Sequence, residues 1–202
     1  DNKGKVSLDS INPGQSELKK IIYNRTSLRD YADKEVSLEK AGDILWVTEG
    51  LTIDGISGPT RTSPSAGATN PLTVYIFARN IKDLDQGIYR YHSEEHALFE
   101  VVNGNVSQEL SQAALGQRTL AEAPFTVIIT ANYGNTTSRY GERGKRYVHI
   151  EAGHAAQNAL LMAENKGLRG VVIGAFHDED LQETMGGIKE VPLIIIPMGY
   201  GS

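Results

Sequence analysis

The chain has 202 residues, of which 40% are hydrophobic and 22% charged, and a formal net charge of −5 at pH 7. Such a chain is long enough for one domain with a sizeable core, and its acidic balance argues against a nucleic-acid-binding surface. The absence of cysteine excludes disulfides, thiolate nucleophiles and Cys-ligated metal sites, and no apolar run approaches the roughly 20 residues of a membrane span.

The first quarter of the chain predicts two helices and a long loop within a single domain, residues 1–202. Residues 1–15 are polar and contain Gly and Pro, which is typical of an extended arm. Helical spacing of apolar residues predicts helices over 16–23, with Ser16 as the N-cap, and over 37–46. Residues 50–71 are rich in turn formers and predict an irregular loop.

The rest of the chain mixes strand and helix patterns, which predicts an α+β or α/β fold. The short runs of β-branched, aromatic and apolar residues predict these strands: 73–78, 87–91, 97–102, 125–130, 170–174 and 193–197. The second and third strands are separated by a short polar turn and predict a hairpin, and the uninterrupted apolar run of 125–130 predicts a central strand. The helical patterns that remain cover 106–116, 148–166 and 177–185, and Gly167 is expected to end the longest.

The longest predicted helix carries a stripe of small residues on one face. The stripe comprises Ala152, Ala155, Ala156, Ala159 and Ala163, with Gly153 beside it. Small residues let a neighbouring helix approach closely. The neighbour could belong to the same chain or to a second copy across a two-fold axis, and the pattern favours neither.

Residues 25–29, Arg-Thr-Ser-Leu-Arg, predict a phosphate-binding segment after the first helix. Two guanidinium groups can make bidentate, charge-assisted hydrogen bonds to phosphate, and the two hydroxyls can add neutral ones. A solvated surface turn is the alternative for such a short motif. The motif gains weight from the Pro/Ser/Gly-rich turn 59–75, whose small residues would let a flat or anionic ligand approach the main chain.

Several other patterns suggest chemistry that the sequence does not support further. His92 and His96 match the spacing of a metalloprotease motif but fall in the predicted hairpin turn, so no metal site is expected. Glu151 and His154 have the spacing of di-iron helix bundles, which need a second copy that the chain lacks. We expect instead that Glu151, His154 and Asn158 form a polar stripe that faces a buried site. A nucleophile elbow around Ser65 would require Gly at position 63, which is Ser, and this makes a hydrolase a distant alternative.

Residues 139–147 are dense in cationic and aromatic side chains and lead into the longest helix. Such a segment is either a solvated charged loop or the lid or wall of a site for an anionic or planar group.

In this order and spacing, the motifs resemble the FMN-dependent nitroreductase superfamily, and most closely its SagB-type azoline dehydrogenase branch. The segments that carry the resemblance, from about Val6 to Gly199, are 25–29, 45–46, 61–68, 87–91, 123–124, 139–143, 151–158, 174–176 and 197–199. The resemblance implies a nitroreductase-like α+β fold, with a central mixed, mainly antiparallel sheet flanked by helices. It also implies a homodimer with FMN at an interface that contains the long helix.

The resemblance also implies roles for individual residues. Those that would hold the FMN phosphate and ribityl chain are Arg25, Thr26, Ser27 and Arg29. Those that would reach the flavin ring from the other subunit are Pro64, Ser65 and Ala66, with Gly67 beside them. Ile173, Gly174 and Ala175 would lie along the ring, and a backbone N–H would lie near its reactive nitrogen. Gln157 and Asn158 would lie behind these residues.

Two positions depart from the pattern of the family. Azoline-oxidising members carry a Lys-Tyr pair where this chain has Arg139 and Tyr140, and arginine is a poor base because it keeps its proton. Tyr140 could still orient a substrate or act as an acid. Relatives often place a basic residue after the last strand, whereas this chain ends in residues 198–202 without one.

We therefore expect an FMN-dependent oxidoreductase that passes electrons from NAD(P)H to a nitroaromatic or quinone-like acceptor. The alternatives are dehydrogenation of a modified peptide or azoline-type substrate, and a non-catalytic flavin-binding or storage protein. We expect no nucleic-acid partner, and a cytoplasmic location, which the composition does not decide.

Overall fold

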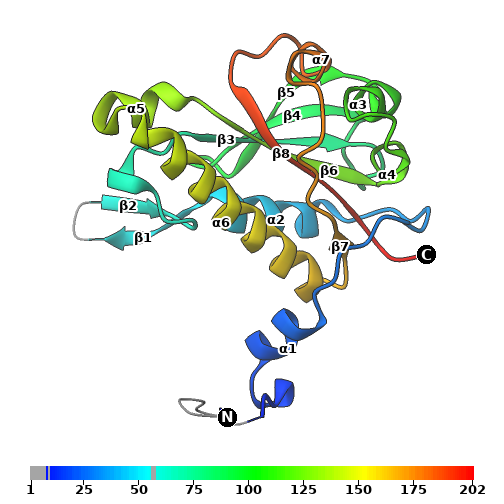
Figure 1. Ribbon diagram of the computed structural model, residues 1–202. Coiled ribbons are helices and arrows are strands. Elements are labelled where there is room, and N and C mark those ends of the chain that lie inside the picture. Colours follow the sequence, from blue (N-terminus) through cyan, green and yellow to red (C-terminus); the bar gives the residue numbers. More distant parts are fainter. Residues whose placement is uncertain (1–7, 9, 56–57) are drawn as a thin grey trace, which may run out of the picture.

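A computed structural model describes residues 8, 10–55 and 58–202. Its centre is a six-stranded sheet with the strand order β5-β4-β3-β6-β8-β7, and every neighbouring pair is antiparallel (Figure 1). The strands are β3 (Leu72–Ala78), β4 (Gly87–His92), β5 (Ala97–Asn103), β6 (Phe125–Ala131), β7 (Arg169–Gly170) and β8 (Val191–Gly199). The predicted hairpin is β4–β5.

Strand β6 is central, as its uninterrupted apolar run predicts. All of its residues are buried, and it pairs with β3 on one side and β8 on the other. Because both faces of this strand are covered, apolar residues occur at successive positions without the alternation of a half-exposed strand.

Helices cover both faces of the sheet and give the predicted α+β class. The helices are α1 (Glu17–Asn24), α2 (Leu38–Glu49), α3 (Ser107–Ala113), α4 (Arg118–Glu122), α5 (Tyr133–Tyr140), α6 (Arg143–Asn165) and α7 (Asp178–Thr184). Residues of α2 and α6 share one buried cluster with one face of the sheet, and residues of α3, α4 and α7 share a second cluster with the other face. Ser16 caps α1, as predicted, by accepting a hydrogen bond from the backbone of Lys19, and Ser37 caps α2 in the same way through Lys40.

The small-residue stripe of α6 packs inside the chain. Its five alanines are all buried in the cluster that contains α2 and the sheet. The opposite side of α6 is open, since Gly153, His154 and Gln157 are exposed and Ile150 is 48% exposed. Of the two alternatives for the stripe, packing within one chain is the one observed, and a partner would contact the other side of the helix.

The structure corrects three predicted segments. Residues 50–71 contain a two-stranded hairpin, β1 (Leu51–Gly55) with β2 (Gly58–Arg61), and a 3₁₀ turn η2 (Ala66–Ala68), where an irregular loop was expected. Residues 139–147 end α5 and begin α6, because only a two-residue connection separates these helices. The strand predicted over 170–174 is shorter, and pairing with β8 resumes only at Ile173, which bridges Ile195.

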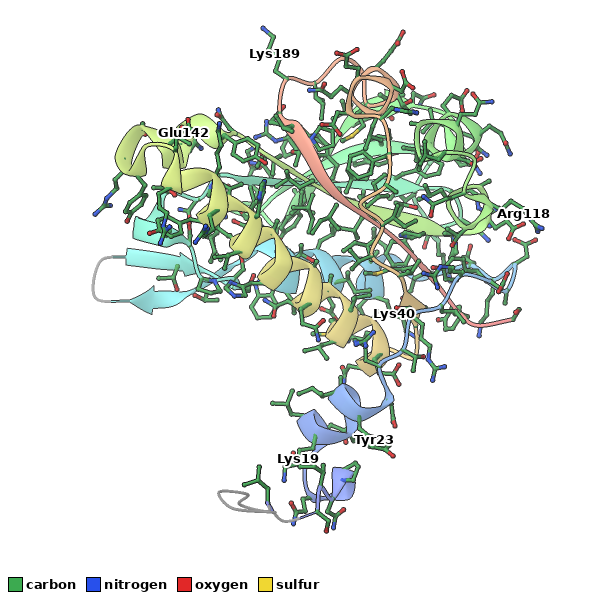
Figure 2. The ribbon with its side chains drawn as sticks, viewed as in Figure 1. Lys19, Tyr23, Lys40, Arg118, Glu142 and Lys189 are labelled. Carbon is green, nitrogen blue, oxygen red and sulfur yellow. The ribbon has the colours of Figure 1, made fainter. Side chains whose placement is uncertain are left out.

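Helix α1 extends away from the rest of the fold (Figure 1). Figure 2 shows Lys19 and Tyr23 on this projecting element, and Leu18, Ile22 and Tyr23 are all exposed. A 3₁₀ turn, η1 (Pro13–Gln15), precedes it in part of the segment predicted as an arm, of which residues 1–7 and 9 lie outside the described residues. Within the described part of the chain, no helix combines the length and apolarity that a membrane crossing requires.

The packing of α6 predicts that introducing leucine on its buried side lowers the free energy of unfolding more than introducing leucine on its exposed side. Ala159→Leu adds volume where the side chain is fully buried, so it should lower the free energy of unfolding by about 1–3 kcal/mol. Gln157→Leu, on the exposed side of the same helix, should change it by no more than about 0.5 kcal/mol. Urea unfolding of both variants measures the difference, and equal effects would contradict the described packing.

Candidate functional site

Main-chain pairing holds the predicted phosphate segment, residues 25–29, beside β7. Ser27 forms a parallel bridge with Gly170, and the backbone N–H of Leu28 donates to the carbonyl oxygen of Gly170 at 3.2 Å. A Cβ at position 170 would lie 2.7 Å from the carbonyl oxygen of Pro197 on β8, so only glycine lets β7 approach β8 this closely. The segment therefore has a defined place at the end of the sheet where β8 finishes.

The side chains of this segment remain available to a ligand. Ser27 and Arg29 are exposed and Arg25 is half-buried. Among the described residues, neither arginine takes part in an ion pair. Two guanidinium groups without carboxylate partners suit a phosphate, which supplies the missing negative charge.

Residues 173–175 follow β7, the edge strand beside which the phosphate segment lies. Ile173 is buried, and its N–H and carbonyl group exchange hydrogen bonds with Ile195 at 2.8 and 3.0 Å. Gly174 and Ala175 follow and are exposed, and a Cβ at Gly174 would meet no atom within 4 Å. The structure thus groups two of the predicted sets, 25–29 and 173–175, around β7 and leaves open space over Gly174.

The third predicted set, residues 64–67, groups with Arg139 and Tyr140. Gly67 has φ +60°, and a Cβ there would lie 2.7 Å from Nη1 of Arg139 and also against the Tyr140 hydroxyl. Arg139 Nη1 donates to the carbonyl oxygen of Gly67 at 3.0 Å. Within the loop, the Asn70 N–H donates to Ser65 Oγ at 2.9 Å. These contacts give residues 64–67 a fixed conformation against the end of α5.

Helix α6 separates the two groups. Tyr140 lies just before its first residue and Arg169 just after its last, and its 23 residues span about 34 Å. Figure 1 shows α5 near one end of α6 and β7 near the other. One chain therefore does not bring residues 64–67 to residues 25–29 and 173–175.

The two further candidates on α6 have different surroundings. Asn158 donates from Nδ2 to the carbonyl oxygens of Val47 and Thr62, at 3.1 and 3.3 Å, so its amide group ties α6 to α2 and to the segment after β2. Gln157 is exposed. The expected polar stripe is wrong, because Glu151 is buried, His154 is exposed and Asn158 is half-buried.

The histidines of the β4–β5 turn make local contacts. The Tyr91 hydroxyl hydrogen-bonds His96 Nδ1 at 2.8 Å, and His92 Nδ1 lies 3.5 Å from the Glu95 carboxylate. In the described part of the chain, no group of three or more potential metal ligands gathers.

Sequence reasoning missed a polar cluster below the 64–67 loop. The Ser63 hydroxyl donates to Glu49 Oε2 at 3.0 Å, and the Arg61 guanidinium lies 3.6 Å from Glu49 Oε1 and 3.1 Å from Glu94 Oε1. Ser93 also accepts a hydrogen bond from Arg61. The cluster borders a cavity of about 820 Å³. No local sequence pattern indicates this cluster, because its members come from α2, from β2 and the residues after it, and from the β4–β5 turn.

Burial changes the acidity of two carboxyl groups in this region. Desolvation raises the pKa of Glu49 to about 7; Ser63 and Arg61 oppose the rise, and the charge of Glu151 adds to it. Desolvation also raises the pKa of Glu151. The side chain of Ser65 and the backbone amide of Ala66 lie next to this carboxylate and partly oppose the rise in its pKa. Near neutral pH, Glu49 is therefore divided between its neutral and ionised forms.

Comparison with known proteins assigns the arrangement to a family. The nitroreductase family profile matches residues 22–200. A protein of Methanocaldococcus jannaschii that is named as a nitroreductase is 41% identical over 183 residues, which are 91% of this chain and 90% of that protein.

Two more distant similarities extend the comparison. The microcin B17-processing protein McbC of Escherichia coli is 28% identical over 68% of this chain, and the match covers 54% of McbC, so the chain spans about half the length of that relative. A crystal structure of a protein from Anabaena variabilis, also named as a nitroreductase, superimposes with a TM-score of 0.81 and 24% identity over 95% of this chain and 39% of that chain. The second match concerns the fold alone. The fold, the family profile and the M. jannaschii relative together show that this chain belongs to the nitroreductase family.

Proposed function

We propose that this protein binds FMN and passes electrons from NADH or NADPH to a flat organic acceptor such as a nitroaromatic or a quinone. The observation that carries the proposal is the pairing of Ser27 with Gly170. This pairing places the two arginines and two hydroxyls of residues 25–29 near the open surface at Gly174, and neither arginine has an ion-pair partner among the described residues. When bound, FMN supplies the hydride chemistry, and the chain supplies binding and orientation.

The residues present suit the phosphate and the ring of FMN. Arg25 and Arg29 would bind the phosphate, with the hydroxyls of Thr26 and Ser27 as further donors. Ile173 has its main chain engaged by Ile195, so it would hold Gly174 and Ala175 in place along the ring.

A homodimer would complete the site, since residues 64–67 lie against the end of α5 and the first half of α6 rather than beside β7. In a two-fold dimer, the Pro64–Gly67 loop of one chain would face residues 25–29 and 173–175 of the other. The open side of α6 and the exposed apolar residues of α1 support this proposal, because a second copy would cover them. Burial of such apolar surface is the main driving force of association.

Arg139 and Tyr140 would act together at the flavin-facing loop. The hydrogen bond from Arg139 to Gly67 would hold the loop in position. Tyr140, whose hydroxyl lies beside Gly67, is the group we propose to orient the acceptor or to supply a proton. Gln157 and Asn158 would contribute from behind, Asn158 through its hold on the segment that precedes the loop.

Dehydrogenation of a modified peptide is the second candidate. It is favoured by the similarity to McbC, whose name connects that protein with microcin B17 processing. An azoline oxidation that requires a lysine base is disfavoured, because the guanidinium of Arg139 keeps its proton and is already bonded to Gly67. A flavin-storage protein would bind FMN without accepting electrons from a nicotinamide.

An anaerobic absorbance titration of the FMN-reconstituted protein tests the function. We expect NADH or NADPH to bleach the flavin band and a nitroaromatic or a quinone to restore it. Bound flavin that neither nucleotide reduces would favour the dehydrogenase or storage alternatives. Protein that binds no flavin would overturn the proposal.

Arg25→Ala should weaken FMN binding without weakening riboflavin binding. The loss of a charge-assisted hydrogen bond to phosphate amounts to about 1.5–3 kcal/mol, or roughly a 10- to 150-fold increase in Kd. Riboflavin lacks the phosphate, so its affinity should stay unchanged. Flavin fluorescence titration measures both, with Arg118→Ala, an exposed arginine on α4, as the control. Equal losses for the two flavins would refute the phosphate assignment.

Mixing two variants tests whether two chains share each site. Arg25→Ala/Arg29→Ala and Pro64→Trp should each lose FMN, the first at the phosphate and the second by bulk at the ring. After an equimolar mixture is unfolded and refolded, half of the dimers are mixed and each has one intact site, so about one quarter of the wild-type FMN occupancy should return. Each variant refolded alone is the control, and no recovery in the mixture would mean that the site lies within one chain.

A further inference from the structure

Strands β3 and β4 separate at one end of the sheet. They pair from Tyr75 to Ala78, opposite Arg90 to Gly87, and no further. Beyond this point, Leu72, Thr73 and Val74 of β3 pair only with β6, while Tyr91 and His92 of β4 pair only with β5. Residues 72–74 and 90–92 line the cavity of about 820 Å³. The cavity thus occupies the opening between two strands that are neighbours elsewhere, and its volume is that of a small-molecule site.

Glu49, the last residue of α2, lines this cavity with an unsatisfied oxygen. The residue is only 5% exposed. Its Oε2 accepts a hydrogen bond from Ser63, but its Oε1 finds no hydrogen-bond donor among the described residues. The nearest cation, Nε of Arg61, is 3.6 Å away, which is too far for a hydrogen bond. A buried acceptor of this kind favours a ligand that brings a donor.

The charges around Glu49 favour a cationic donor. Among the residues that the structure describes, Arg61 is the one guanidinium that contacts both Glu49 and Glu94, so the ionised cluster has two carboxylates for one cation and an excess negative charge. Glu151 of α6 adds a further negative field at Glu49. An ammonium group at Oε1 would balance this charge and fill the missing hydrogen bond at once.

The walls of the cavity suit an apolar body attached to that cation. Leu72, Val74 and Ala131 contribute apolar surface, and Tyr91 and Tyr133 contribute aromatic rings, which attract cations. Arg90 and Lys189 also line the cavity, but both are exposed, and Arg90 lies on the opposite face of β4 from Tyr91. Of the cationic residues that line the cavity, Arg61 is therefore the one that contacts the buried carboxylate.

We infer that the opening between β3 and β4 binds a primary amine with an apolar body, whose ammonium group donates to Glu49. Arg61 and Asn70 line this cavity and also a smaller one of about 440 Å³ along residues 60–70. The amine would therefore lie beside the loop that carries Pro64 and Gly67. Amine binding requires no flavin, so it stands or fails independently of the proposed FMN chemistry.

Calorimetric titration with benzylamine, using benzyl alcohol as its neutral counterpart, tests the inference on the wild-type chain. We expect saturable binding of benzylamine, at least roughly tenfold tighter than that of the alcohol. The pKa of Glu49 is about 7, so its carboxylate is mostly neutral near pH 6 and mostly ionised near pH 8. Benzylamine stays protonated over this range and should bind about tenfold more tightly at the higher pH. Absent binding, or equal binding of the two probes, would overturn the inference.

Two variants separate Glu49 from its surroundings. His92 also lines the cavity and would repel a cation when protonated, so Glu49→Gln is needed to isolate the carboxylate. This variant should lose at least about tenfold in benzylamine affinity and most of the pH dependence. The control is Glu95→Gln, which should bind benzylamine like the wild type, because Glu95 is an exposed glutamate of the β4–β5 turn and does not line the cavity. Wild-type affinity in Glu49→Gln would overturn the inference; if that variant does not fold, the comparison of the two probes on the wild type still decides.

Discussion

The close packing of α6 against α2 and the sheet is the constraint on which the rest of the structure depends. Alanines at 155 and 159 leave no side chain beyond Cβ, so the helix lies near its neighbours along its whole length. Asn158 adds a polar tie to α2 at the same level. Because α6 is long and immobilised, it determines how far apart the segments at its two ends must lie.

The two ends of α6 carry the two halves of the proposed flavin site. At one end, Gly67 lets Arg139 and Tyr140 approach the main chain of the loop, and at the other, Gly170 lets β7, which pairs with residues 25–29, lie close against β8. In both places a larger side chain would occupy the space that the neighbouring segment uses. A nitroreductase-family chain built in this way has two partial sites that a second copy could complete.

The buried carboxylates form a second polar region behind the loop. Glu49 and Glu151 belong to different helices, and each is desolvated by the packing that brings α2 and α6 together. Their positions link the chemistry of the loop to the core. The opening between β3 and β4 exists because the two strands stop pairing with each other beyond Tyr75, which leaves a cavity next to Glu49.

The sequence by itself determined the elements that depend on local pattern. The sequence predicted the buried run of β6, the serine cap of α1, the β4–β5 hairpin and the family motif at 25–29. Periodicity, capping and turn chemistry involve residues close together in the chain, so they can be recognised without the fold. The β1–β2 hairpin was missed because Gly, Pro and Ser in residues 50–71 are also typical of irregular loops.

Only the tertiary structure decided which distant residues meet. It assigned the alanine stripe to packing within the chain, exposed His154 and buried Glu151, and joined Glu49 to Ser63 and Arg61. It also placed residues 64–67 beside the end of α5 and Glu151 of α6, and residues 25–29 beside β7. Contacts of this kind depend on how the helices are oriented on the sheet and on which side chains become neighbours in the packed core. The spacing of residues along the sequence does not specify either of these.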